Sequence, residues 1–120
     1  MDTSDQTVFY VGEWRVSPKE DALYREGRTV RIEPRAMEVL AYLASRPGEV
    51  VLRADLEAAV WTGMVVSDDA VTSTIIKLRK ALGDSARNPS FIATIPKRGY
   101  QLIAPVTKPA AGADEVAVVD

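Results

Sequence analysis

Neither cysteine nor histidine occurs among the 120 residues of the chain. Without cysteine there is no disulfide framework and no thiolate metal site. Without histidine the chain lacks the commonest general base and the usual nitrogen ligand of zinc. Catalysis would have to rest on paired carboxylates, but Asp68 and Asp69 stand at an expected helix start, where acids favour the helix dipole. We therefore expect no enzyme, no cofactor and no bound metal.

Long apolar runs are also absent, since none approaches the roughly 18 residues of a membrane span. Residues 1–6 are polar and acidic rather than signal-like. Hydrophobic residues nevertheless make up 47% of the chain, which is enough for one globular core. We expect a flexible N-terminus over residues 1–7, one domain over residues 8–104, and a flexible, Pro/Ala-rich linker or tail over residues 105–120.

Acidic residues slightly outnumber basic ones, and the net charge is −2. This is the wrong sign for a simple electrostatic DNA binder. The charges are unevenly distributed, however. Residues 68–103 hold six Lys or Arg and three Asp, a local charge of +3. Residues 1–67 hold eight cations and eleven acids, a charge of −3. Binding of an anionic partner is therefore expected from the C-terminal part of the domain.

The clearest helical pattern spans residues 68–82 and ends at Gly83, with Ser67 as the expected N-cap. Its inner face carries apolar residues at the spacing of a buried helix stripe, namely Val71, Ile75, Leu78 and Leu82. Its outer face is small, polar or cationic apart from one isoleucine, and comprises Ser73, Ile76, Lys77 and Lys80. Such a face suits contact with a polyanion.

A basic hairpin is predicted next, with strands over residues 91–95 and 100–103 joined by Pro96-Lys97-Arg98-Gly99. Gly99 is expected to supply the conformational freedom of this turn. The preceding helix can enter a major groove about 12 Å wide while the cationic tip reaches phosphates or the next groove. Helix and hairpin together therefore indicate duplex binding.

The N-terminal half predicts short strands over residues 8–11, 14–16, 22–25 and 29–32. A first helix begins at Glu33-Pro34 and ends before Pro47-Gly48, and a second spans residues 53–61 without a capping side chain at Leu52. This order predicts an α+β fold: a winged helix-turn-helix with an N-terminal antiparallel sheet, three helices and a C-terminal β-hairpin wing.

Several motifs resemble the OmpR/PhoB-type DNA-binding domain, and the wing is most similar to the ToxR/CadC-like branch. The motifs are Glu33-Pro34, Leu43-Ala44-Ser45-Arg46-Pro47-Gly48, Val60-Trp61, Val66-Ser67-Asp68, Leu78-Arg79-Lys80-Ala81-Leu82-Gly83-Asp84 and Thr94-Ile95-Pro96-Lys97-Arg98-Gly99-Tyr100. The resemblance covers roughly residues 8–103. It implies a bacterial transcription regulator that binds double-stranded DNA, with the third helix in the major groove and the wing on the minor groove or the backbone.

By position, the resemblance implies the following DNA-facing residues: Thr72, Ser73, Ile76, Lys77 and Lys80 on the helix, and Lys97 and Arg98 on the wing. Arg79 is expected either near a phosphate or bracing the fold by pairing with an acid. Trp61 and Thr94 fall at backbone-contact positions, with a core aromatic as the alternative for Trp61. Ile76 departs from the polar or basic residues usual at its position, which favours an apolar contact such as a thymine methyl.

The resemblance also implies partners and context. We expect a monomer in solution, because no heptad seam or large apolar face is left over after the three helices pack, and the resemblance implies two copies in tandem on DNA. The loop over residues 62–66 is expected either to contact RNA polymerase or to pack on the domain's own core. A sensory or membrane domain is expected to follow the linker, so the domain is cytoplasmic, either free or tethered to the inner membrane. The competing hypothesis, favoured by the net acidity, is a winged helix used for protein contacts without DNA binding.

Overall fold

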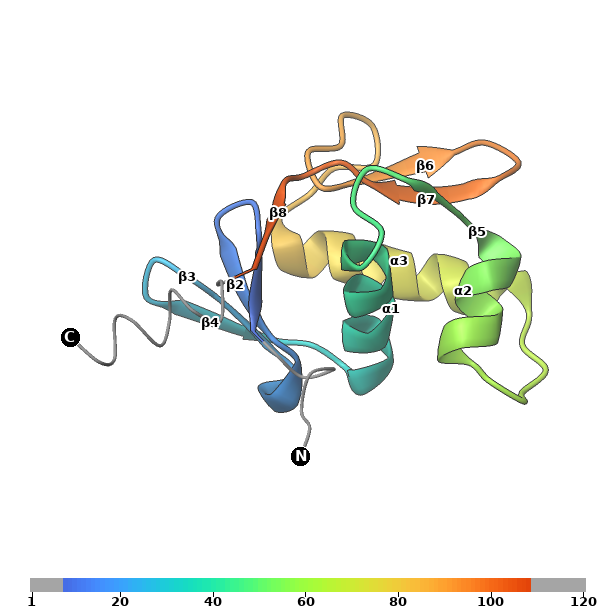
Figure 1. The fold of residues 1–120 in the computed structure, drawn as a ribbon, viewed down its shortest axis with the longest axis horizontal. Coiled ribbons are helices and arrows are strands. Elements are labelled where there is room, and N and C mark those ends of the chain that lie inside the picture. The colour runs from blue at the N-terminus through green and yellow to red at the C-terminus, as the bar shows by residue number, and fades with distance from the viewer. Residues whose placement is uncertain (1–7, 109–120) are drawn as a thin grey trace.

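The computed structural model describes residues 8–108, which form three α-helices and two antiparallel sheets (Figure 1). The helices are α1 (Pro34–Ala44), α2 (Arg53–Val60) and α3 (Asp68–Leu82). The first sheet has the order β4-β3-β2-β1-β8 and contains β1 (Phe9–Val11), β2 (Trp14–Ser17), β3 (Ala22–Arg25), β4 (Arg28–Arg31) and β8 (Val106–Thr107). The second has the order β5-β7-β6 and contains β5 (Val50–Leu52), β6 (Ile92–Ile95) and β7 (Gly99–Leu102). This is the predicted α+β winged helix-turn-helix, and β6 with β7 forms the wing.

The core forms around α3, whose predicted bounds and inner face are confirmed. The four apolar residues of that face are at most 1% exposed: Val71, Ile75, Leu78 and Leu82. Gly83 ends the helix in the left-handed conformation, with φ of 76°. The Trp14 indole donates a hydrogen bond of 3.1 Å to the Leu82 carbonyl and so ties the first sheet to the end of α3. Ser67 occupies the N-cap position but its side chain makes no capping hydrogen bond, which corrects the expected role of its hydroxyl.

The first sheet is larger than predicted. Glu26 and Gly27 both have positive φ, which gives the tight β3–β4 turn that the glycine favours. The expected tail boundary at residue 105 was wrong, because Val106 and Thr107 pair with Val11 and Tyr10 of β1. A two-residue strand is too short to produce an alternating pattern, so only the long-range pairing reveals it. The flexible segments expected over residues 1–7 and 109–120 lie outside the described residues. Within residues 8–108 no helix is long and apolar enough to cross a membrane.

The wing is paired on its inner edge with β5, a strand that the sequence analysis did not predict. Val51 of β5 is opposite Tyr100 of β7, and both side chains are buried. Gly99, opposite Leu52, does not have a positive φ; the residue in the wing turn that does is Lys97, at 64°. A Cβ on Gly99 would lie 2.0 Å from the Val51 carbonyl oxygen. Gly99 is therefore required for the close approach of β5 rather than for the turn, which corrects the expectation.

Replacing Gly99 with alanine should lower the free energy of unfolding by about 3 kcal/mol, because the new methyl group collides with backbone that side-chain rotation cannot move. Gly48→Ala is the matched control. Gly48 has a φ of 76° but no atom within 4 Å of an added Cβ, so the expected loss is about 1 kcal/mol, from backbone conformation alone. Urea unfolding of both variants measures the difference. Equal losses would show that the contact with β5 does not constrain position 99.

Candidate nucleic-acid interface

The outer face of α3 is exposed to solvent from Thr72 to Lys80. The five helix residues predicted to face DNA are all exposed: Thr72, Ser73, Ile76, Lys77 and Lys80. Ile76 is the most informative of them, since 58% of a large apolar residue remains exposed in the middle of the helix. Burial of the opposite face explains this, because α3 packs against α1 and α2 and its apolar stripe belongs to the common core. The geometry brings these five residues together on one surface, here called the reading face.

Two of the reading-face side chains already have partners within the protein. The Lys77 ammonium lies 3.2 Å and 3.3 Å from the two carboxylate oxygens of Glu33, the residue that precedes α1. The Thr72 hydroxyl accepts a hydrogen bond of 3.2 Å from Nη1 of Arg53, the first residue of α2. The sequence analysis missed both Glu33 and Arg53 as neighbours of this face. Their spacing along the chain carried no signal, because the beginnings of α1 and α2 reach the side of α3 only through the fold.

Arg79 is buried, with only 8% of the residue exposed. Its Nε and Nη2 donate to the Ile92 carbonyl oxygen at 3.2 Å and 2.9 Å, and Nη2 also donates to the Thr94 hydroxyl at 2.7 Å. Of the two expected roles, the structure shows the bracing one, with a carbonyl and a hydroxyl in place of an acid. Arg79 thereby fixes the position of β6 relative to α3. Thr94, in contrast, is exposed on the wing.

A second polar contact fixes the segment that leads into the wing. The Asp84 carboxylate accepts hydrogen bonds from the backbone N–H groups of Ser90 (2.6 Å), Phe91 (3.2 Å) and Ile92 (2.9 Å). Partial burial alone would raise the pKa of Asp84, but these backbone donors outweigh it and hold the pKa below its ordinary value. Sequence reasoning did not single out Asp84, although its place directly after the helix-ending Gly83 suits a loop-closing acceptor.

The wing tip carries the cations that were predicted for it. Pro96 and Lys97 form a tight turn closed by a hydrogen bond of 3.0 Å from the Arg98 N–H to the Ile95 carbonyl. Lys97 and Arg98 are both exposed. Within residues 8–108 neither side chain has a hydrogen-bond or ion-pair partner. The carbonyl of Arg98 accepts from the Arg53 N–H at 3.1 Å, so the beginning of α2 supports the tip.

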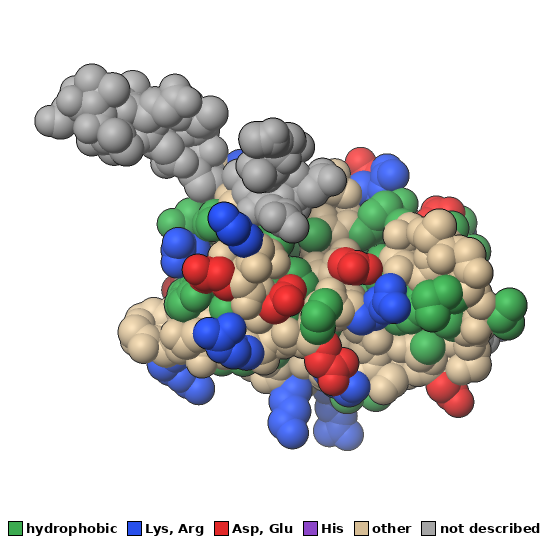
Figure 2. All heavy atoms as spheres, turned by 90° about the horizontal axis from the view of Figure 1, so that it is seen from below, with side chains coloured by type: hydrophobic (Ala, Val, Ile, Leu, Met, Phe, Trp, Pro, Cys, Tyr) green, Lys and Arg blue, Asp and Glu red, His purple; other side chains and the backbone are tan. Residues whose placement is uncertain are grey.

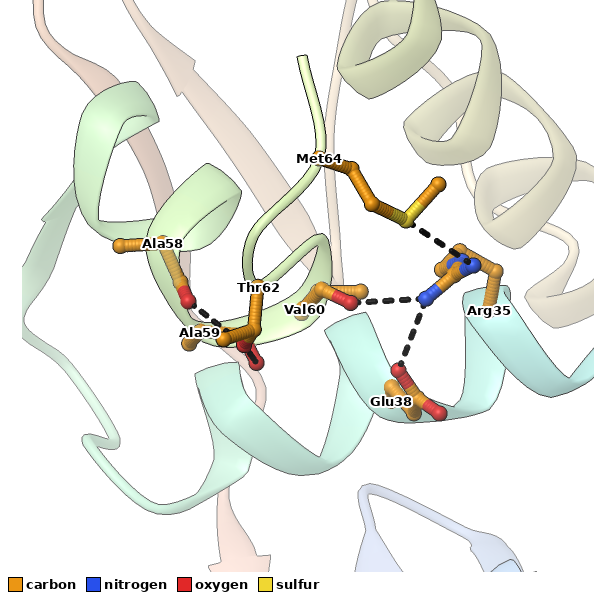
Figure 3. Close-up of polar contacts among 7 residues, drawn as sticks. All are labelled: Arg35, Glu38, Ala58, Ala59, Val60, Thr62 and Met64. Atoms are coloured by element: carbon orange, nitrogen blue, oxygen red, sulfur yellow. Dashed lines mark hydrogen bonds and ion pairs between the residues drawn. The ribbon is translucent and has the colours of Figure 1, made fainter. Parts of the chain in front are cut away.

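Trp61 lies in the core with 6% exposure, and the Arg35 guanidinium is 5.6 Å from the centroid of its ring. Of the two roles expected for Trp61, core aromatic or contact with the DNA backbone, the structure shows the core aromatic. The same arginine reaches from α1 to the loop over residues 62–66, as Figure 3 shows. It donates to the Val60 carbonyl at 2.8 Å, and its Nη2 lies 3.9 Å from the Met64 sulfur.

The loop over residues 62–66 packs on the domain's core only in part. Val66 is half-buried against the core. Met64 and Val65 remain 53% and 102% exposed, although Arg35 holds the beginning of the loop. The loop is therefore anchored at both ends and presents two apolar side chains to solvent.

In Figure 2 the visible face of the molecule mixes Lys and Arg with Asp and Glu rather than showing a patch of one sign.

A helix with an open polar face, preceded by a shorter helix and flanked by a braced hairpin, defines the winged-helix class of DNA-binding fold. The family described as "Transcriptional regulatory protein, C terminal" matches residues 27–102, and the chain belongs to it. The resemblance to the OmpR/PhoB type and its ToxR/CadC-like branch is thereby confirmed. The family consists of transcription-factor domains rather than of a class of enzymes.

Individual relatives agree with this assignment. The chain is 43% identical to the transcriptional activator CadC of Escherichia coli over 102 residues, 84% of this chain and 20% of CadC. It is 46% identical to the cholera toxin transcriptional activator of Vibrio cholerae over 79 residues, 64% of this chain and 27% of that protein. The chain thus spans about a fifth to a quarter of the length of these curated relatives.

Solved structures give the same result. The DNA-binding domain of Escherichia coli CadC superposes with a TM-score of 0.78 at 41% identity, covering 86% of this chain and 97% of that one. The Klebsiella pneumoniae RstA DNA-binding domain, solved in complex with the RstA box, has a TM-score of 0.71 at 26% identity, covering 80% and 96%.

Replacing Arg79 with methionine keeps an apolar stem but removes every donor to Ile92 and Thr94. The Ile92 carbonyl loses its charged partner, so the free energy of unfolding should fall by about 1–3 kcal/mol. Lys80→Met is the matched control: it removes the same charge one residue further on, from an exposed position, and should change stability by less than about 0.5 kcal/mol. Chemical unfolding compares the two. Equal stability would mean that Arg79 does not hold the wing.

Proposed function

We propose that this domain binds specific double-stranded DNA as part of a transcriptional regulator, with α3 in the major groove and the wing on the minor groove or backbone. The observation that carries the proposal is the fixed juxtaposition of the reading face and the wing: Arg79 joins α3 to β6, and both surfaces present exposed cations. A helix in the major groove with a hairpin beside it can contact base edges and flanking phosphates together.

Roles within this surface follow from exposure. Ser73, Ile76 and Lys77 lie where base edges can be reached, and Thr72 and Lys80 border them on the same face. Lys97 and Arg98 neutralise phosphates. Thr94 is exposed as a residue, and its hydroxyl, which accepts a hydrogen bond from Arg79, donates its proton to the DNA backbone. Arg79 and Trp61 support the surface from within, since both are buried.

We propose three further interactions for the full-length protein. The domain is a monomer in solution and binds as two tandem copies on direct repeats about one helical turn apart. The exposed pair Met64 and Val65 contacts RNA polymerase, a role that their solvent exposure permits. A sensory or membrane segment follows the linker. The regulator is tethered to the membrane if that segment spans it and is free otherwise.

The wing is tested by its salt dependence. Each phosphate contact adds about 0.9 to the slope of log affinity against log salt. Replacing Lys97 and Arg98 with alanine should flatten that slope by up to about 2 and weaken the best site and random duplex by similar factors. Lys19→Ala with Arg28→Ala is the control, because it removes two exposed cations from the first-sheet region. Mobility shifts over a salt series measure both. An unchanged slope in the wing variant favours the competing hypothesis of a protein-interaction module.

The apolar reading position is tested by Ile76→Ala. If Ile76 contacts a thymine methyl, the variant should bind the best site, selected from a random duplex pool, about 1 kcal/mol more weakly. Affinity for random duplex should not change, and thermal stability should hardly move, because 58% of the residue is already exposed. A large loss of stability with intact binding would instead make Ile76 a structural residue.

A further inference from the structure

The carboxylate of Glu33 is directed at the reading face rather than at its own helix. Glu33 is the N-cap residue of α1, but its side chain makes no capping hydrogen bond there. Its two oxygens instead lie 3.2 Å and 3.3 Å from the Lys77 ammonium on α3. The packing of α1 on α3 therefore places an acid beside the surface proposed to enter the major groove.

This ion pair contributes little to the fold. The side chains of Lys77 and Glu33 are 55% and 64% exposed, and ion pairs with this exposure stabilise proteins only slightly. Replacing either residue should accordingly leave the fold intact. The effect of the pair should appear where Lys77 meets another anion. On random duplex, where no base contact is matched, that anion is a phosphate of the DNA backbone.

Lys77 differs in this respect from the cations of the wing. Lys97 and Arg98 have no ion-pair partner within the described residues, so a phosphate that they neutralise releases a counterion from the DNA. Lys77 already has a counterion in Glu33. A phosphate that takes Lys77 must displace this carboxylate, which then remains near the DNA as an unneutralised negative charge. The cation released from the phosphate is therefore offset by a cation taken up beside the freed carboxylate of Glu33.

We infer that Glu33 attenuates DNA affinity by acting as the internal counterion of Lys77. The inference rests on the proposed function, since it concerns the strength of that same binding. It also makes a directional claim: an acid that merely oriented Lys77 for productive contact would strengthen binding, whereas an internal counterion weakens it.

The test compares Glu33→Gln with the parent in mobility shifts on a random-sequence duplex over a salt series. Glutamine keeps the size of the side chain and removes its charge. At low salt the variant should bind severalfold more tightly, and the slope of log affinity against log salt should steepen by about 0.9, the contribution of one further phosphate contact. Glu26→Gln makes the same change of net charge at the exposed β3–β4 turn and should have a much smaller effect.

A Lys77→Gln background shows whether Lys77 is the intermediary. There, Glu33→Gln should have no more effect than Glu26→Gln. Weaker binding by Glu33→Gln, an effect equal to that of the control, or a full effect without Lys77 would each overturn the inference. If the parent binds DNA with a wing-dependent salt slope and Glu33→Gln is inert, only this inference fails. If the parent binds no duplex at all, the proposed function fails with it.

Discussion

The interface depends on a buried cation that does not face outward. Arg79 places its guanidinium under the wing and donates to the Ile92 carbonyl and the Thr94 hydroxyl. A buried charge is tolerated only when hydrogen bonds replace its water, and such charge-assisted bonds are among the stronger ones in proteins. Asp84 completes the arrangement with three backbone donors from residues 90–92. One positive and one negative group thus hold β6 against α3, and the reading face and wing keep a fixed relative position.

Burial therefore divides the cations of the C-terminal region into two groups. Arg79 positions the wing from inside, whereas Lys80, Lys97 and Arg98 are exposed and available to an anion. The formal charge of +3 over residues 68–103 overstates what the surface offers, because one of its cations is buried and another, Lys77, is paired with Glu33. An acidic chain with few available cations should bind random duplex weakly and depend on base contacts for its preferred site.

Local patterns predicted the long elements well, and long-range contacts explain the rest. The bounds of α3 are those predicted, because an apolar stripe along a fifteen-residue helix and a helix-ending glycine are both local signals. The strand β8 has two residues, too few for an alternating pattern, and the three residues of β5, Val50–Leu52, are all apolar and show no alternation. The role of Gly99 depends on its distance from Val51, and the role of Arg79 depends on Ile92, thirteen residues away. Sequence spacing limited Arg79 to two roles without choosing between them, and it assigned Gly99 to the turn, which the structure corrects.

Weak single-domain binding has a consequence for assembly on DNA. The electrostatic contribution is common to every sequence, so lowering it reduces specific and random affinity together and leaves their ratio largely intact. A domain with a partly neutralised reading face then spends less time on random duplex but also binds its own site less tightly. Two copies on adjacent repeats, as proposed above, would recover that affinity, because the second copy would bind at a high effective concentration once contacts between the copies or a shared tether held it near the first. The inferred effect of the Lys77–Glu33 pair and the proposed tandem arrangement would therefore be parts of one mechanism, in which specificity comes from the reading face and overall affinity from the number of domains bound.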